Sequence, residues 1–162
     1  MNLFKKLWPV LFLFLGCATK PSLTTFFVSD GVNQYFVPPT EWSAQGSRAS
    51  AKLDITYRTN TNVPATVNIS FFGEKETPRK INSISLVGKD IECPLDNIAV
   101  IYPDLDKRKL RVTTQGNRDT IISVFEAEPV TLVAEIDGVK YTYVPDKNFI
   151  KLKNDFLVVV SY

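Results

Sequence analysis

The chain has 162 residues, with 19 Lys or Arg against 17 Asp or Glu and no histidine. The lack of histidine removes the commonest general base and most zinc sites, and the balanced charge gives no electrostatic basis for binding nucleic acid. An apolar content of 44% is too high for a disordered chain, so we expect a folded domain with its own core.

The N-terminus is a basic segment followed by an apolar run. Lys5 and Lys6 precede Leu7–Leu15, which is apolar apart from the break at Pro9. This layout is typical of a secretory signal, because a membrane-spanning helix needs about 20 apolar residues. The run ends in Phe14-Leu15-Gly16-Cys17, which resembles the lipobox of bacterial lipoproteins.

This resemblance is limited to residues 1–17, and no domain family is recognised. It implies that 1–16 is a cleaved signal peptide and that Cys17 is acylated with palmitate-type chains and becomes the first residue of the mature protein. Two or more chains give stable anchoring, so we expect an exported protein held on a bacterial membrane, inner or outer, by lipid. The alternative is an ordinary signal peptide cut nearby, for example at Ala18. Without the two signal lysines the mature chain is close to neutral, so surface charge is not expected to hold it on the membrane.

A polar tether at 17–23, which starts at the lipidated cysteine, leads into a single domain at 24–162 that reads almost entirely as strand. Apolar and polar residues alternate at 51–58 and again at 65–71, with a turn-rich segment between, which predicts an antiparallel hairpin. The run Ile98–Tyr102 is continuously apolar, which favours a strand covered on both faces. Other strands are expected at 24–28, 32–37, 81–87, 97–102, 109–114 and 119–125.

The sharpest local prediction is a hairpin at Asp137-Gly138. Asp-Gly between two alternating segments favours a two-residue type I′ turn. This turn places Glu135 opposite Lys140 and gathers the apolar residues of both strands on one face. A slip of one residue would send those apolar side chains to the wrong face, so the register is well specified.

A second hairpin is predicted at the C-terminus. Ile150 and Leu152 precede the turn residues Asn154-Asp155, and the apolar segment 156–160 follows. Because this segment is apolar on both faces, we expect it to be buried or, alternatively, to be an edge that accepts a partner strand.

Short strands with turn-rich connections predict an all-β fold, an antiparallel β-sandwich, of which the immunoglobulin-like topology is one form. The Cys-Trp-Cys core pattern of antibody domains is absent. Apart from Cys17 the chain has one cysteine, Cys93, so acylation of Cys17 leaves no intrachain disulfide. We expect Cys93 to act as a small buried apolar residue.

The most site-like segment runs from Tyr35 to Trp42. Pro38 and Pro39 favour an extended, rigid backbone beside several aromatic residues. Tyr35, Phe36 and Trp42 are therefore a candidate binding surface for a protein or a glycan. The alternative is that Tyr35, Val37 and Trp42 cap the core.

The only basic cluster is Lys107, Arg108 and Lys109 together with Arg111, and it could meet anionic headgroups or an acidic partner. The alternative is a solvated turn whose charges discourage edge-to-edge pairing. Asp104 and Asp106 supply too few ligands for calcium, so no metal site is expected, and no cofactor is expected either.

The sequence contains no Gly-x-Ser-x-Gly elbow and no phosphate-binding loop, and no catalytic residue is assigned. We expect a lipid-anchored cell-envelope protein that binds a partner or supports an assembly, and that is not an enzyme. The alternatives are a hydrolase acting on envelope material and a structural subunit that assembles by strand addition. The expected partners are the membrane, through the lipid, and an envelope protein or glycan, with no nucleic acid and the oligomeric state left open.

Overall fold

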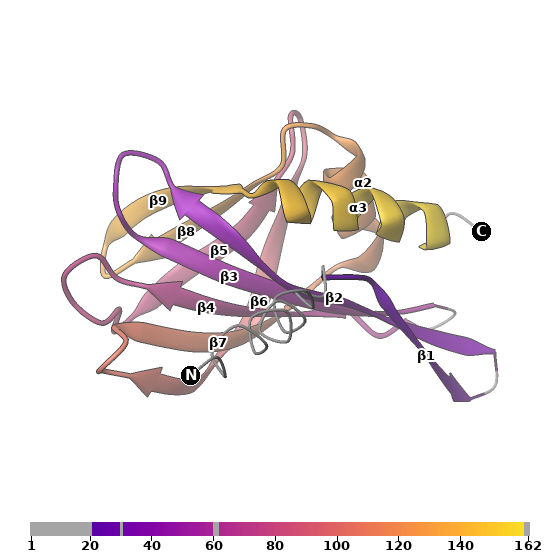
Figure 1. Cartoon of the computed structure of the whole chain (residues 1–162), viewed down its shortest axis with the longest axis horizontal. Coiled ribbons are helices and arrows are strands. Elements are labelled where there is room, and N and C mark those ends of the chain that lie inside the picture. Colours follow the sequence, from indigo (N-terminus) through magenta and orange to yellow (C-terminus); the bar gives the residue numbers. More distant parts are fainter. Residues whose placement is uncertain (1–20, 30, 60–61, 161–162) are drawn as a thin grey trace, which may run out of the picture.

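The strands form one antiparallel sheet that closes into a barrel. The computed structural model describes residues 21–29, 31–59 and 62–160 (Figure 1). The strands are β1 (Thr24–Ser29), β2 (Val32–Ala44), β3 (Ser50–Arg58), β4 (Ala65–Phe72), β5 (Ile81–Val87), β6 (Glu92–Asp104), β7 (Lys109–Gly116), β8 (Thr131–Ile136) and β9 (Val139–Pro145). The helices are α2 (Arg118–Glu126) and α3 (Lys147–Val160).

The predicted β-sandwich, with or without immunoglobulin-like topology, is wrong in its architecture, although the fold is predominantly β. The strand order is β1-β2-β3-β4-β7-β6-β5-β8-β9, and an additional pairing of β2 with β9 closes eight of the strands into a barrel. The long strand β2 makes this possible, because its register against β3 shifts between Val37 and Thr40, at Pro38-Pro39. Its first half pairs with β1 and its second half with β9. Such bulges bend strands, which is what closure of a sheet requires.

Two crossing connections distinguish the ends of the barrel. Residues 73–80, here called the strap, connect β4 to β5 and bypass β7 and β6. This end, which also holds the β8–β9 turn, is called the strap end. At the other end α2 connects β7 to β8, and α3 follows β9. This second end is called the helix end.

Aromatic rings pack the helices onto the helix end. The ring of Trp42 lies 4.6 Å from that of Phe149, and the ring of Tyr57 lies 5.1 Å from that of Phe156, measured between centroids. Phe125 of α2 contacts both phenylalanines of α3. The core is thus continuous from the barrel interior into the two helices.

The hairpins predicted over 51–71 and at Asp137-Gly138 are confirmed. Strands β3 and β4 pair antiparallel, with Leu53 opposite Ile69. The β8–β9 hairpin has the predicted register, with Glu135 opposite Lys140. Its turn residues Asp137 and Gly138 have φ values of 52° and 80°, as a type I′ turn requires.

The strand predicted at 119–125 is wrong, because this segment is α2. The side chain of Asn117 caps the helix by accepting a hydrogen bond from the backbone N–H of Thr120 at 3.0 Å. The apolar residues recur at helical rather than alternating spacing, which packs one face of α2 on the core. The buried residues of the helix are Ile121, Val124 and Phe125.

The predicted C-terminal hairpin is also wrong, because 147–160 forms α3. Asp146 begins the helix by accepting a hydrogen bond from the N–H of Phe149 at 2.9 Å. Asn154-Asp155, read as a turn, lies on the exposed side of the helix. The segment 156–160 is therefore not available as an edge strand.

The signal peptide, Cys17 and the first part of the tether lie outside the described residues. Within the described ranges, no helix combines the length and apolar character that would be needed to span a membrane. Cys93 is a free, buried cysteine, as expected for a small apolar core residue.

Candidate functional site

The strap is fixed at its start by the turn between β6 and β7. The backbone N–H of Gly73 donates to the carbonyl oxygen of Arg108 at 2.9 Å. In return, the guanidinium group of Arg108 donates to the backbone carbonyl of Glu74. Gly73 is required here, because a Cβ at this position would lie 1.7 Å from the carbonyl oxygen of Glu76.

The carboxylate of Glu74 ties the same segment to the β2–β3 connection. It accepts hydrogen bonds from the hydroxyl of Ser47 at 3.0 Å and from the backbone N–H of Arg48 at 3.4 Å. The hydrogen bond from Ser47, followed by the one from Arg48, lowers the pKa of Glu74 below its ordinary value.

The end of the strap is fixed by the β8–β9 turn. The carboxylate of Asp137 accepts hydrogen bonds from the backbone N–H of Lys80 at 2.8 Å and from that of Arg79 at 3.1 Å. The backbone N–H of Asp137 donates to the carbonyl of Lys80 at 2.9 Å. The strap therefore crosses the strap end with both of its ends held.

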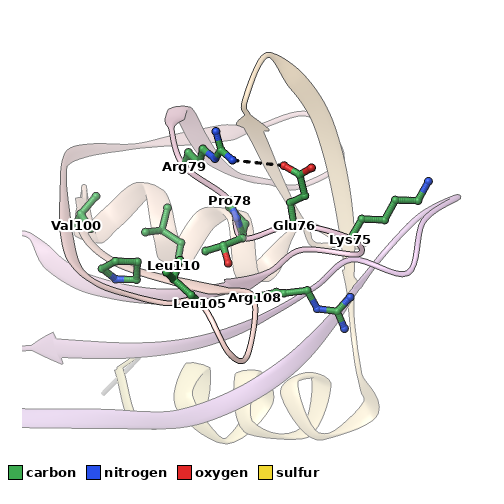
Figure 2. A pocket seen from close by; sticks show the side chains of 10 residues that line it. Lys75, Glu76, Pro78, Arg79, Val100, Leu105, Arg108 and Leu110 are labelled. Carbon is green, nitrogen blue, oxygen red and sulfur yellow. Dashed lines mark ion pairs between the residues drawn. The ribbon is translucent and has the colours of Figure 1, made fainter.

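A groove of about 550 Å³ lies between the strap and the β6–β7 hairpin (Figure 2). Its apolar lining comes from both sides and consists of Pro78, Val100, Pro103, Leu105 and Leu110. Its charged lining residues are Lys75, Glu76, Arg79 and Arg108. Arg79 forms an ion pair with Glu76 at 3.7 Å, so two cationic side chains remain in excess over the one acidic group.

The groove exists because β6 separates from β5. The two strands are paired only over a short stretch, from Ser85 opposite Pro94 to Val87 opposite Glu92. Beyond this stretch, within the described residues, β6 pairs with β7 alone. Two register shifts bend this part of β6. Val100 pairs with Val112, whose side chain is buried in the core, yet Val100 itself is 57% exposed. A core-facing surface is thus left uncovered.

A second cavity of about 400 Å³ lies on the other side of the strap, and residues 75–78 of the strap line both this cavity and the groove. Phe72, Tyr141 and Tyr143 give it an aromatic wall. Burial, with a smaller contribution from neighbouring Tyr141, raises the pKa of Tyr143 well above its ordinary value of 10.0. Tyr143 is therefore neutral across the physiological range.

The structure does not bring the predicted aromatic surface together on the outside. Trp42 is fully buried, and its indole N–H donates to the hydroxyl of Thr40 at 3.1 Å. Tyr35 is buried as well, and Phe36 is half-buried. The alternative interpretation, that Tyr35 and Trp42 belong to the core, fits this placement.

The predicted basic cluster is divided among different partners. Lys107 and Lys109 form ion pairs with Asp104 at 3.7 and 3.6 Å. The pKa of Asp104 is lowered, first by a hydrogen bond from the backbone N–H of Lys107 and then by the two lysine charges. Lys109 also lies over the ring of Tyr102. Only Arg108 lines the groove.

Sequence reasoning missed most of the groove. The apolar run 98–102 predicts a strand covered on both faces, but Val100, Ile101 and Tyr102 are exposed. The available signal was Asn97, a turn-favouring residue just ahead of that run, where the structure has a positive φ of 54°.

The described residues contain no group of three or more His, Cys, Asp or Glu side chains that could hold a metal ion. Comparison of the chain with protein-family models, with curated proteins and with solved structures found no match. The function is therefore argued from the geometry of the groove and from the N-terminal sequence.

Proposed function

We propose that this protein is a lipid-anchored cell-envelope protein that binds an envelope protein partner through the groove at the strap end. The observation that carries the proposal is the groove itself, where an uncovered apolar lining from β6 and β7 lies beside an excess of cationic side chains. Exposed apolar surface of this kind marks interaction sites, because water does not solvate it well.

The chemistry of the lining supports a protein segment over a glycan as the ligand. Sugars bind by stacking on flat aromatic rings, whereas this lining is aliphatic: Val100, Leu105 and Leu110 with two prolines. Lys75 and Arg108, together with Arg79, favour a segment that carries a carboxylate beside its apolar side chains. The fitting ligand is an acidic, apolar segment of a partner chain.

The carboxylates at the strap end support binding over hydrolysis. Glu76 pairs with Arg79, and Asp137 uses its oxygens to accept backbone N–H groups of the strap. The pKa of Glu74 is lowered rather than raised, which is the opposite of what a general acid needs. These three acids therefore have structural partners.

The lipid anchor is proposed from the N-terminal sequence. Labelling of cells with a fatty acid should modify the wild-type protein and not Cys17→Ser. A Cys17→Ser protein that still takes up the label would contradict the proposed anchor.

The groove is tested by a photo-crosslinking residue placed at Leu105, which is exposed in the groove. We expect a discrete crosslinked species in the intact envelope that is lost in Arg79→Glu and kept in Lys89→Glu, a change of the same charge at the β5–β6 turn outside the groove. Equal crosslinking in both variants would show that the groove charge does not select the partner. Crosslinking to purified envelope glycan alone would contradict the protein partner and identify a glycan as the ligand.

A further inference from the structure

The β1–β2 hairpin carries an exposed apolar tip. Phe26 is 49%, Phe27 is 75% and Val28 is 48% exposed. Figure 1 shows this hairpin projecting beyond the barrel at one end of the long axis. Within the described residues β1 pairs with β2 alone, so it is an edge strand.

Two properties set this tip apart from an ordinary edge strand. Consecutive residues of a strand point to opposite faces, so Phe26 and Phe27 expose apolar side chains on both faces of the hairpin. Edge strands are usually protected by charged residues, and the segment Thr24–Ser29 has none. A partner protein that packs on one face would leave the other face in water, whereas the boundary region of a lipid bilayer surrounds both.

The tether is short enough to keep the base of this hairpin within reach of the proposed lipid anchor. Thr24 lies seven residues after Cys17, and a fully extended chain of that length spans at most about 25 Å. We propose that the tip of the β1–β2 hairpin inserts into the headgroup and acyl-chain boundary of the membrane that holds the lipid, as a second contact. This inference rests on the proposed lipid anchor.

The rest of the fold is consistent with this orientation. The β8–β9 turn, which marks the strap end, lies at the opposite end of the long axis from the hairpin tip (Figure 1). A hairpin in the membrane would therefore direct the groove away from the bilayer, toward a partner. The C-terminus of α3, near exposed Val158, lies at the same end as the hairpin.

The membrane contact is expected to depend on apolar burial and not on lipid charge. The strand residues of the tip are uncharged, and the only ionisable residue in the sequence of the turn is Asp30. Attachment of the hairpin should therefore be similar on zwitterionic and anionic bilayers, and insensitive to salt.

The test uses the mature lipidated protein, reconstituted into phosphatidylcholine vesicles whose acyl chains carry bromine, a contact quencher of tryptophan. Phe27→Trp should lose most of the emission of the new tryptophan. Leu105→Trp, equally exposed but at the strap end, should keep its emission. Trp42 is buried in the core and contributes the same background to both variants.

Unquenched Phe27→Trp emission would overturn the inference. Crosslinking of two copies through the hairpin would do so as well, since it would show that β1 pairs with a second copy. The acyl mass on Cys17, measured on the same samples, separates the two proposals: lipidated protein with an unquenched tryptophan refutes the hairpin contact alone, and protein without acyl mass refutes the anchor. Phe27→Ser, which retains the lipid, should reduce protection of the hairpin from proteolysis on vesicles and leave the stability of the barrel unchanged.

Discussion

Asp137 and Lys80 are joined by two hydrogen bonds, although they lie 57 positions apart in the chain. The backbone N–H of Lys80 donates to the Asp137 carboxylate at 2.8 Å, and the N–H of Asp137 donates to the carbonyl of Lys80 at 2.9 Å. The aspartate thus has two roles, because it adopts the positive φ of the turn and also fixes the end of the strap. The position of one wall of the groove depends on a turn residue in another hairpin.

Asp137→Ala should release the end of the strap. The change removes the acceptor of two backbone N–H groups and the tolerance for positive φ, so we expect a loss of about 1–2 kcal/mol in the free energy of unfolding. Asp137→Asn, which keeps one acceptor oxygen and that tolerance, should lose less. Urea unfolding measures the stability, and trypsin cleavage after Lys75 and Arg79 should be faster in Asp137→Ala. Unchanged cleavage would contradict the anchoring role.

Gly138→Val should destabilise the domain by about 1 kcal/mol or more, because a β-branched residue resists positive φ. The φ of Gly138 is 80°, and no atom lies within 4 Å of the position that a Cβ would take, so the cost comes from the backbone and not from a clash. Gly138→Asn is the matched control and should cost less, since asparagine tolerates this conformation. Equal melting temperatures for the wild type and the valine variant would contradict the turn assignment.

The sequence was sufficient for strands whose partners are near in the chain. The β8–β9 register follows from an Asp-Gly turn and an apolar alternation that agree with each other. The closure of β2 on β9 joins residues about a hundred positions apart, and alternating strands have the same pattern in a sandwich and in a barrel. The bulge at Pro38-Pro39 decides between them, and the two prolines predict only an extended, rigid backbone there.

The groove could not be predicted because it depends on where β6 loses its partner. Only the ladder between β5 and β6 shows that Val100 is uncovered, because Asn97 marks an irregularity in β6 without fixing where that ladder ends. The helices were missed for a different reason. Continuous apolar residues at 156–160 suggested a strand and obscured the spacing of Phe149, Leu152 and Phe156, which fits one face of a helix.

The variant Phe156→Ala distinguishes the helix α3 from the strand that the sequence predicts for the same segment. Phe156 is fully buried between Tyr57 and Phe125, so we expect a loss of about 3–5 kcal/mol. Val158→Ala should cost less than about 0.5 kcal/mol, because this side chain is 60% exposed. In a strand the two residues would share one face and both would be costly. Similar losses for the two variants, measured by urea unfolding, would contradict α3.

In the variant Glu128→Gln, the free energy of unfolding should depend less steeply on pH in the acid range than in the wild type. Glu128 accepts a hydrogen bond from the ammonium group of the buried Lys153 at 2.7 Å, and this bond, together with the lysine charge, lowers the pKa of Glu128 below its ordinary value of 4.5. A depressed pKa contributes stability above the unfolded-state pKa that is lost as the pH falls through the folded-state pKa. Wild-type stability should therefore fall below about pH 4.5, and less steeply in Glu128→Gln.

The matched control for this experiment is Glu126→Gln. Glu126 is exposed, and it forms no ion pair with any residue that the structure describes. Its removal should leave the acid slope as steep as that of the wild type, measured as the free energy of unfolding at a series of pH values. A slope that is equally steep in Glu128→Gln would show that the contact with Lys153 does not contribute to acid sensitivity.

Cys93 should be unreactive until the barrel opens. The thiol is 1% exposed, and burial raises its pKa above the ordinary value of 9.0, so little reactive thiolate forms at neutral pH. Alkylation in native buffer should be at least ~100-fold slower than in urea, because the reaction waits for local opening of the structure. Leu105→Cys provides an exposed thiol in the same chain and should react at once. In urea, one thiol per mature wild-type chain should react with the alkylating reagent, since the proposed lipid blocks Cys17. Two reactive thiols would contradict that modification, and rapid labelling of Cys93 in native buffer would contradict its place in the core.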